Sequence, residues 1–473
     1  MLAKEPLNEA AKAYPLLNLE EIEDTVLATI INKKILDIKR PYVKKERTLP
    51  LRSLKKALTT QKRRHFILEC KQSSPTLGDF CEDFNLDKLI ACYEKYADAI
   101  SVLCEEHFFK GSINYLQYVK ERTHLPVLCK DFIISKQQID EAYAHGADAI
   151  LLMLSVLKED AFLELYRYAK SLSLDVLCEV DNEKQAQFAK DHKIEIVGFN
   201  NRNLRTLTIS LDNALQLKKI FHDETVLVSE SGINDHTDLT YVHTLDNFLI
   251  GSTITKEQDV AFKTRALQYG LNKICGITTE EALKTAITME ASIAGLIFVK
   301  GSPRYLKLEK AASLISPYRG NIKFCGVFLD EKTDTICEYA RKLNLDYIQL
   351  HGSETQDTIT SLRARLQDIK IIKAINIKCK DDFLKIKEYQ NLCDLIILDS
   401  KAPGSGSSFN WSAIPKNLDK RKILLSGGIG PDNVKEALAQ GFVGLDLNSK
   451  LEKIKGVKEP SLIRETFNII NNY

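Results

Sequence analysis

Charged side chains recur in this sequence at one kind of position, the end of a short β-rich run. In the first half of the chain, Glu69 and Lys71 close one such run, and Lys130 and Glu179 close two others. Carboxylates and ammonium groups gathered in one mouth shift each other's proton affinity and can supply an acid and a base near neutral pH. One such charge alone is often only a solvated surface residue. The set of four predicts acid–base chemistry.

A different pair of reactive groups occurs in the second half. Cys275 closes the run at 271–278, and Asp399 closes the run LIILDSK. A thiolate acts as a general base when a cation or a helix terminus lowers its pKa, and a protonated carboxyl can donate to a leaving oxygen. Cys275 by itself could equally be a buried thiol that packs as a small hydrophobe. We also expect Thr278 to cap the helix that follows.

Small residues follow the last two runs of each half. These segments read SESGI at 229–233, LIGSTI at 249–254, LLSGGI at 424–429 and GLDLNS at 444–449. A backbone without large side chains can bring its N–H groups close to a phosphate, and barrels place phosphate sites after strands 7 and 8. The pattern predicts that each half binds a small phosphorylated substrate.

The elements that must position these residues alternate as the strands and helices of a barrel do. Eight β-rich runs alternate with helical stretches over roughly 200 residues, which is typical of a (β/α)8 barrel. A doubly wound sheet is the rival, but it usually has a glycine-rich turn after its first strand, where this chain reads ECKQSSP. The runs are 65–71, 97–103, 126–130, 147–153, 174–180, 195–200, 225–229 and 247–251.

A second set of eight runs begins at residue 271. The predicted fold is therefore α/β, with two consecutive (β/α)8 TIM barrels. We expect the first barrel at 1–255, including a helical extension at 1–48, then a connecting helix at 256–270 and the second barrel at 271–473. The runs of the second half are 271–278, 293–299, 323–328, 346–350, 370–374, 394–398, 422–425 and 442–447.

Composition narrows the class of protein. The chain has 473 residues, is 44% apolar and 27% charged, and carries a net charge of +2, so no global field attracts nucleic acid or anionic lipid. Its eleven cysteines are scattered, which predicts reduced thiols in the cytoplasm. His351 and Glu354 lack a third ligand nearby. We expect a monomer with no metal, no cofactor, and no nucleic-acid or membrane partner.

Six motifs of the first half, taken in order, carry a family resemblance. FILECKQSSP, PVLCKDF, VLCEV, GFNNRNLRTL, VSESGI and FLIGS resemble indole-3-glycerol phosphate synthase over about 1–255. The resemblance implies that Lys130 is the general acid of ring closure and that Glu179 and Lys71 transfer protons during dehydration. It further implies that Glu69 and Asn200 orient the substrate, that Arg202 faces the anthranilate carboxylate, that Ser231 lines the site, and that Ser74, Gly232, Gly251 and Ser252 hold the phosphate.

The second half resembles phosphoribosylanthranilate isomerase over 271–473, through KICGIT, FVKGSPRY, IQLHG, LDSKAPGSGSSFNW, LSGGI and GLDLNS. The resemblance implies an Amadori rearrangement in which Asp399 protonates the furanose oxygen and Cys275 removes the C2′ proton. Asn410 stands where many members carry aspartate. The remaining implied site residues are Arg304 for the anthranilate carboxylate, His351 and Asp446 for the sugar, and Gly427, Gly428, Asn448 and Ser449 for the phosphate.

The order of the two halves is that of a fused bacterial enzyme of tryptophan biosynthesis. One rival is a pair of histidine-pathway sugar-phosphate barrels, which use paired aspartates where this chain has Glu69, Lys71 and Cys275. A second alternative is a regulatory or scaffolding protein in which at least one barrel has lost its catalytic residues. None of the expected catalytic residues is missing from this sequence. The segment PGSGSS at 403–408 lacks the lysine of a nucleotide loop and is expected to cover the second mouth.

Overall fold

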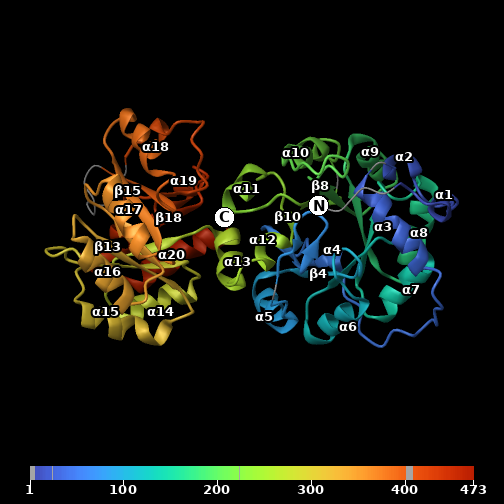
Figure 1. The fold of residues 1–473 in the computed structure, drawn as a ribbon, viewed down its shortest axis with the longest axis horizontal. Helices are drawn as coiled ribbons and strands as arrows, with labels where there is room; N and C mark the ends of the chain where they lie inside the picture. The colour runs from blue at the N-terminus through green and yellow to red at the C-terminus, as the bar shows by residue number, and fades with distance from the viewer. Residues whose placement is uncertain (1–5, 24, 82, 223, 401–408) are drawn as a thin grey trace. The chain divides into compact units, whose positions relative to one another are not determined.

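The computed structural model describes residues 6–23, 25–81, 83–222, 224–400 and 409–473. Its eight-stranded parallel sheets form two closed barrels, with strand orders β1-β10-β9-β8-β7-β6-β5-β4 and β11-β12-β13-β14-β15-β16-β17-β18 (Figure 1). The prediction of two TIM barrels is confirmed. The chain divides into two compact units, Met1–Asn234 with Val242–Lys263 and Asp235–Tyr241 with Thr264–Tyr473, so the division falls inside α13 (Val260–Tyr269).

The strands of the first barrel lie within the predicted runs, with one exception at β9. Most are buried on both faces, as expected when a parallel sheet is closed on itself and covered by helices. The strands are β1 (His65–Cys70), β4 (Ala99–Leu103), β5 (Val127–Lys130), β6 (Ala149–Met153), β7 (Asp175–Val180), β8 (Ile196–Asn200), β9 (Val226–Glu230) and β10 (Asn247–Ile250). A short ribbon, β2 (Ser73–Ser74) with β3 (Gly78–Asp79), follows β1.

Four main helices of this half begin at polar caps, which accept hydrogen bonds from the first backbone N–H groups. Asn85, Ser112, Ser135 and Asn182 do this for α5, α6, α7 and α9. The helices are α5 (Leu86–Tyr96), α6 (Ile113–Arg122), α7 (Lys136–Ala144), α8 (Glu159–Ser171), α9 (Glu183–Asp191), α10 (Asp212–Lys218), α11 (His236–Tyr241), α12 (Ser252–Thr255) and α13.

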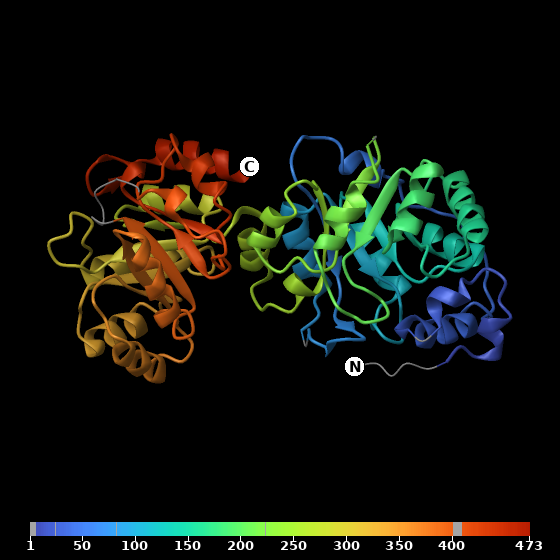
Figure 2. The same cartoon turned by 90° about the horizontal axis from the view of Figure 1, so that it is seen from above.

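The N-terminal extension is helical only in part. Its helices are α1 (Glu9–Lys12), α2 (Leu19–Ile22) and α3 (Val26–Asp37), and α4 (Leu54–Ala57) precedes the barrel; α1, α2 and α3 are the blue helices beside the first barrel in Figure 2. The prediction of helix up to residue 48 was wrong, because Pro41 cannot continue a helix and residues 41–48 are irregular. This stretch is held instead by Arg47, whose guanidinium donates to Asp148 and to backbone carbonyls at the foot of α7.

The second barrel repeats the alternation with shorter loops. Its strands are β11 (Lys273–Cys275), β12 (Ile293–Ile297), β13 (Lys323–Phe328), β14 (Tyr347–Leu350), β15 (Lys370–Ile377), β16 (Leu395–Ser400), β17 (Ile423–Leu425) and β18 (Gly444–Leu447). β15 and β16 run beyond their predicted ends. β11 is shorter than its run, because Gly276 takes a positive φ of 75° and turns the chain out of the strand.

The helices of the second half are α14 (Glu280–Thr288), α15 (Leu308–Ile315), α16 (Thr333–Lys342), α17 (Gln356–Arg365), α18 (Lys385–Tyr389), α19 (Val434–Leu438) and α20 (Pro460–Asn471), with 3-10 turns η1 (Ser316–Tyr318), η2 (Lys380–Leu384), η3 (Trp411–Ala413) and η4 (Ser449–Leu451). A hairpin, β19 (Glu452–Ile454) with β20 (Val457–Lys458), follows η4.

Two local predictions for this half need correction. Thr279, not Thr278, caps α14, by accepting from the N–H of Ala282, while the Thr278 hydroxyl donates to the Gly456 carbonyl at 3.1 Å. The predicted loop at 403–408 lies outside the described residues. Within the described ranges, no helix combines the length and apolar character that crossing a membrane requires.

The second barrel has two apolar cores. One fills the inside of the barrel, with Ile293, Cys325, Ile372 and Leu424, and the other lies between the strands and their helices. Cys275 belongs to the inner core and is only 4% exposed. The alternation of side chains along each strand therefore sends every second residue inward, and the last inward residue reaches the mouth.

A buried ion pair at the foot of the first barrel gives a stability prediction. Asp148 and Lys120 are both fully buried, with Nζ 2.5 Å from Oδ2, and Asp148 also accepts from the backbone of Arg52 and Val127. Removing the charge of Asp148 leaves a buried ammonium without a partner, which costs about 3 kcal/mol. We expect Asp148→Asn to lower the urea midpoint of the circular dichroism transition.

The single tryptophan, Trp411, lies in the second barrel, so its fluorescence transition serves as the internal reference. The matched control is Glu338→Gln, which breaks an exposed ion pair with Lys342 and should leave both transitions in place. An unchanged midpoint for Asp148→Asn would show that Lys120 needs no charged partner.

Candidate active sites

The carboxyl end of the first barrel holds a cluster of five charged side chains, at a cavity of about 440 Å³. Lys130 at the end of β5 contacts Glu230 at the end of β9, and its Nζ lies 3.4 Å from Glu179 Oε2 on β7. The Lys71 ammonium lies 3.6 Å from Glu69 Oε1 on β1. The structure therefore brings together the four acid–base residues expected from the sequence and adds a third carboxylate.

The cluster is electrostatically unbalanced, with three carboxylates against two ammonium groups, all 17% exposed or less. Burial alone would lower the pKa of Lys130, but Glu230, Glu179 and Glu69 together raise it above its usual value. Burial lowers the pKa of Lys71, although Glu69 opposes this. Burial raises the pKa of Glu230 to about 7, against the effect of Lys130. Lys130 is thus held as a cation, while Glu230 titrates near neutrality.

Glu230 was missed in the sequence because SESGI reads as a phosphate-binding turn. β9 extends one residue further than predicted, and Glu230 pairs in register with Asn200 on β8. A Cβ on Gly198 would lie 2.0 Å from Glu230 Oε1, so only glycine leaves room for this carboxylate. Strand parity offered a signal, since Val226, Val228 and Glu230 share one face.

The other residues expected in the first half line the same cavity. Asn200 Nδ2 donates to Glu179 Oε1 at 3.0 Å. Ser231 and Gly232 both have positive φ, 67° and 88°, which turns the chain sharply after β9. A Cβ on Gly251 would lie 2.5 Å from Glu69 Oε1, so this glycine also makes room for the Glu69 carboxylate. The remaining expected residues that line the cavity are Ser74, Arg202 and Ser252.

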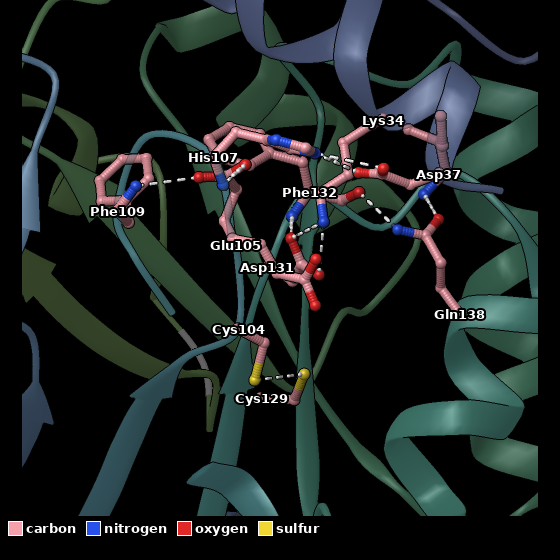
Figure 3. Close-up of polar contacts among 12 residues, drawn as sticks. Lys34, Asp37, Cys104, Glu105, His107, Phe109, Cys129, Asp131, Phe132 and Gln138 are labelled. Atoms are coloured by element: carbon pink, nitrogen blue, oxygen red, sulfur yellow. Dashed lines mark hydrogen bonds and ion pairs between the residues drawn. The ribbon is translucent and has the colours of Figure 1, made fainter. Parts of the chain in front are cut away.

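Side chains of helix α3, in the N-terminal extension, contact the loops that border this mouth (Figure 3). Lys34, with a side chain 6% exposed, reaches the two carboxylate oxygens of Asp131 at 2.7 and 2.8 Å, directly after Lys130. Glu105, fully buried, accepts from the backbone N–H groups of residues 107–109. Phe109 then lies with its ring 5.1 Å from Lys71 Nζ. The extension therefore fixes the surroundings of both lysines.

The second barrel has a cavity of about 370 Å³ at its own carboxyl end. Cys275 of β11 and Asp399 of β16 both line it, and His351 Nε2 lies 3.6 Å from Asp399 Oδ2. Asp446 on β18 is bound by the fully buried Lys273, with Nζ 2.7 Å from Oδ1. Further lining residues that the sequence predicted are Arg304, Gly428, Asn448 and Ser449. Gly427 precedes Gly428 with a φ of 101°.

Comparisons with known proteins match both halves. The indole-3-glycerol phosphate synthase family model matches residues 19–267, and the N-(5′-phosphoribosyl)anthranilate isomerase model matches 272–469. The tryptophan biosynthesis protein TrpCF of Haemophilus influenzae is 38% identical over 468 residues, covering 94% of this chain and 97% of that protein. The chain belongs to this family of bifunctional tryptophan-biosynthesis enzymes.

Other relatives are similar along their whole length. TrpCF of Helicobacter pylori strain 26695 is 36% identical over 460 residues, covering 95% of this chain and 100% of that protein. A crystal structure of phosphoribosyl anthranilate isomerase from Thermotoga maritima is 30% identical with a TM-score of 0.39, covering 42% of this chain and 97% of that one. The family models assign the first barrel to the synthase and the second to the isomerase.

The isomerase mouth contains an acid and a thiol in low-dielectric surroundings. Burial raises the pKa of the Asp399 carboxyl, although the backbone N–H of Ser400 donates to it at 2.7 Å. Burial raises the pKa of the Cys275 thiol, and the ammonium groups of Lys273 and Lys458 oppose that shift. Asp399 is thereby favoured as a proton donor, and Cys275 needs nearby cations to become a thiolate.

Two polar residues of the isomerase mouth were not expected from the sequence. Gln349 donates to His351 Nδ1 at 3.0 Å. His351 Nε2, Gln349 Oε1 and Asn376 Oδ1 are buried at the cavity, and no described residue forms a hydrogen bond with any of them. Buried polar atoms of this kind are normally satisfied, so these three are suited to the hydroxyl groups of a ligand. Asn376 was missed because β15 extends past the predicted end at 374.

Arg304 lies beside the isomerase cavity and is bound on one edge. Its Nε and Nη2 groups donate to Glu452 at 2.7 and 2.9 Å, a bidentate pair on β19. No described residue accepts a hydrogen bond from the remaining Nη1 group. The guanidinium is therefore oriented before any ligand binds, and its free edge is available to an anion.

The position of Glu230 gives a prediction for the pH dependence of the synthase. Below pH 7 this carboxyl takes up a proton, because its pKa is raised to about 7, and Lys130 then loses a charged partner. We expect the synthase kcat/KM to fall as the pH drops below about 7. Glu230→Gln should lower kcat/KM by about 10- to 100-fold and remove that limb of the profile.

The isomerase activity of the same chain is the control and should show no such change in the Glu230→Gln variant. A synthase profile that keeps its acidic limb in this variant would assign the limb to another group.

Proposed function

We propose that the two mouths carry out consecutive steps through the residues described above. In the isomerase barrel, N-(5′-phosphoribosyl)anthranilate becomes 1-(2-carboxyphenylamino)-1-deoxyribulose 5-phosphate. In the synthase barrel, that product closes to indole-3-glycerol phosphate with loss of CO2 and water. The observation that carries the proposal is that each mouth joins a buried acid–base set to a cavity rimmed by the small residues after its seventh and eighth strands.

In the isomerase, Asp399 protonates the furanose oxygen and the ring opens to a Schiff base. Cys275 then removes the C2′ proton, and the resulting enolamine rearranges to the ketose amine. The raised pKa of Asp399 supports its role as the acid. Both side chains line one cavity, as the two steps on a single sugar require.

In the synthase, Lys130 is the general acid that activates the substrate carbonyl for ring closure. Three carboxylates keep it protonated, which suits a donor to a developing alkoxide. Glu179 and Lys71 transfer protons in the dehydration, and the lowered pKa of Lys71 supports its part. Glu230 is added to this set as the carboxylate that contacts Lys130.

Binding of the two substrates is assigned to the rest of each mouth. In the synthase, Glu69 and Asn200 orient the substrate, Ser231 lines the site, Arg202 faces the anthranilate carboxylate, and Ser74, Gly232, Gly251 and Ser252 hold the phosphate. In the isomerase, Arg304 faces the anthranilate carboxylate, His351 and Asp446 position the sugar, and Gly427, Gly428, Asn448 and Ser449 hold the phosphate.

The organisation of the chain completes the proposal. The synthase occupies 1–255, including its extension at 1–48, the connecting helix 256–270, and the isomerase 271–473. The protein works in the cytoplasm as a monomer and uses no nucleic-acid or membrane partner. The free state of all eleven cysteines and the net charge of +2 support this setting.

Separate sites predict that each activity can be removed alone. We expect Lys130→Ala to abolish formation of indole-3-glycerol phosphate, followed by its fluorescence, and to leave isomerisation unchanged. Cys275→Ala should abolish isomerisation and leave cyclisation of added ketose amine unchanged. Each expected loss is at least about 1000-fold, since the variant lacks the acid or base of the chemical step. Loss of both activities in one folded variant would contradict two independent sites.

A further inference from the structure

The hairpin after the last isomerase strand places two charged side chains inside the protein. Glu452 begins β19 and Lys458 ends β20, with side chains 3% and 0% exposed. Two buried charges are costly unless they are paired, and these two contact each other. No role in the reaction described above has been given to either.

Glu452 is shared between two cations. Its carboxylate binds Arg304 through two hydrogen bonds and also accepts from Lys458 and from the backbone of Gly456 at 3.0 Å. Burial alone would raise the pKa of Glu452, but these donors lower it, so it is ionised. Two basic side chains therefore face one carboxylate. Burial lowers the pKa of Lys458, although Glu452 opposes this shift, and the group carries a net positive charge while Lys458 is protonated.

This positive group lies against the peptide that follows Cys275. A Cβ on Gly276 would lie 2.6 Å from Arg304 Cδ and 3.3 Å from Lys458 Nζ. Lys458 also donates to Asn448 Oδ1 at 2.9 Å, and Asn448 lines the isomerase cavity. The Lys458 ammonium thus lies beside Gly276, the residue directly after Cys275, and its charge lowers the pKa of the Cys275 thiol.

We propose that Glu452 and Lys458 are positioning residues of the isomerase. The positive charge of Lys458 stabilises the thiolate form of Cys275. Glu452 orients the Arg304 guanidinium toward the substrate anion. The proposal rests on the proposed function, because it takes Cys275 as the base. It adds two residues that act through their neighbours and do not touch the substrate.

Other groups around Cys275 do not make Lys458 redundant. Lys273, on the same strand, lowers the pKa of Cys275 more than Lys458 does, but Asp446 of β18, with which Lys273 is paired, raises that pKa. Cys325 of β13 is a neutral buried thiol. The cavity side carries Asp399, His351 and Lys455. Beside Gly276, the Arg304–Glu452–Lys458 group sets two basic side chains against one carboxylate.

The test compares Lys458→Met and Lys458→Arg in the full chain. The first readout is the rate at which iodoacetamide alkylates Cys275, measured from pH 6 to 10 by peptide mass spectrometry. We expect the midpoint to rise by about one pH unit in Lys458→Met, because a lost neighbouring cation disfavours the thiolate, and to return in Lys458→Arg. Lys453→Met, an exposed lysine on the same hairpin, is the matched control and should match the wild type.

The second readout is the isomerase rate. In Lys458→Met, kcat should fall about tenfold at pH 7 and recover at higher pH, with KM changing less. In Glu452→Gln, KM should rise about tenfold while kcat changes less, since Arg304 loses its anchor. Synthase activity in the same chain and the thermal transition show that each variant is folded.

The proposal is wrong if the alkylation midpoint stays at its wild-type value in Lys458→Met, or if the lost rate does not recover at high pH. Its failure is distinct from failure of the proposed function. An active Cys275→Ala enzyme would overturn Cys275 as the base, whereas the alkylation midpoint measures the effect of Lys458 on the thiol whatever Cys275 does.

Discussion

The need to pair buried charges governs the arrangement of both active sites in this chain. A barrel mouth places its reactive groups at the rim of an apolar core, where an isolated charge is expensive. The synthase surrounds two ammonium groups with three carboxylates, and burial raises the pKa of one of them, Glu230, to about 7, against the effect of Lys130. The isomerase pairs its buried charges in two separate groups. In one, Lys273 binds Asp446, and in the other, Glu452 binds both Arg304 and Lys458. In each set, one member faces the cavity and another holds it there.

Glycine has a second role in these mouths, besides allowing the backbone to approach a phosphate. Gly198, Gly251 and Gly276 each leave space for a charged side chain of a neighbouring segment: Glu230, Glu69, and Arg304 with Lys458. Close packing around such groups excludes water and fixes their geometry, which strengthens every charge interaction at the site. Substitution of these glycines would act on catalysis through their neighbours.

The fold and most of the site could be predicted because short apolar runs and their polar ends are local signals. The alternating runs predicted both barrels, and residues that close these runs, such as Lys130 and Cys275, line the two cavities. The failures are at boundaries and at partners distant in sequence. The helical part of the extension ends before Pro41, earlier than its apolar periodicity suggested. Strands β9 and β15 extend beyond their predicted ends, so Glu230 and Asn376 were not predicted as site residues. Glu452 could not be linked to Arg304, because nothing local records a contact across 148 residues.

The place of the β19–β20 hairpin in the chain has a consequence for biosynthesis on the ribosome. The synthase mouth is complete once residues up to Lys256 have emerged, since Lys256 is the last residue in the chain that lines its cavity. The isomerase mouth also needs Lys458, which lies 202 residues beyond Lys256 in the chain. Domains generally fold in order from the N-terminus during translation. A nascent chain therefore acquires the later step of the pathway first and gains the earlier one only after the second barrel has been synthesised.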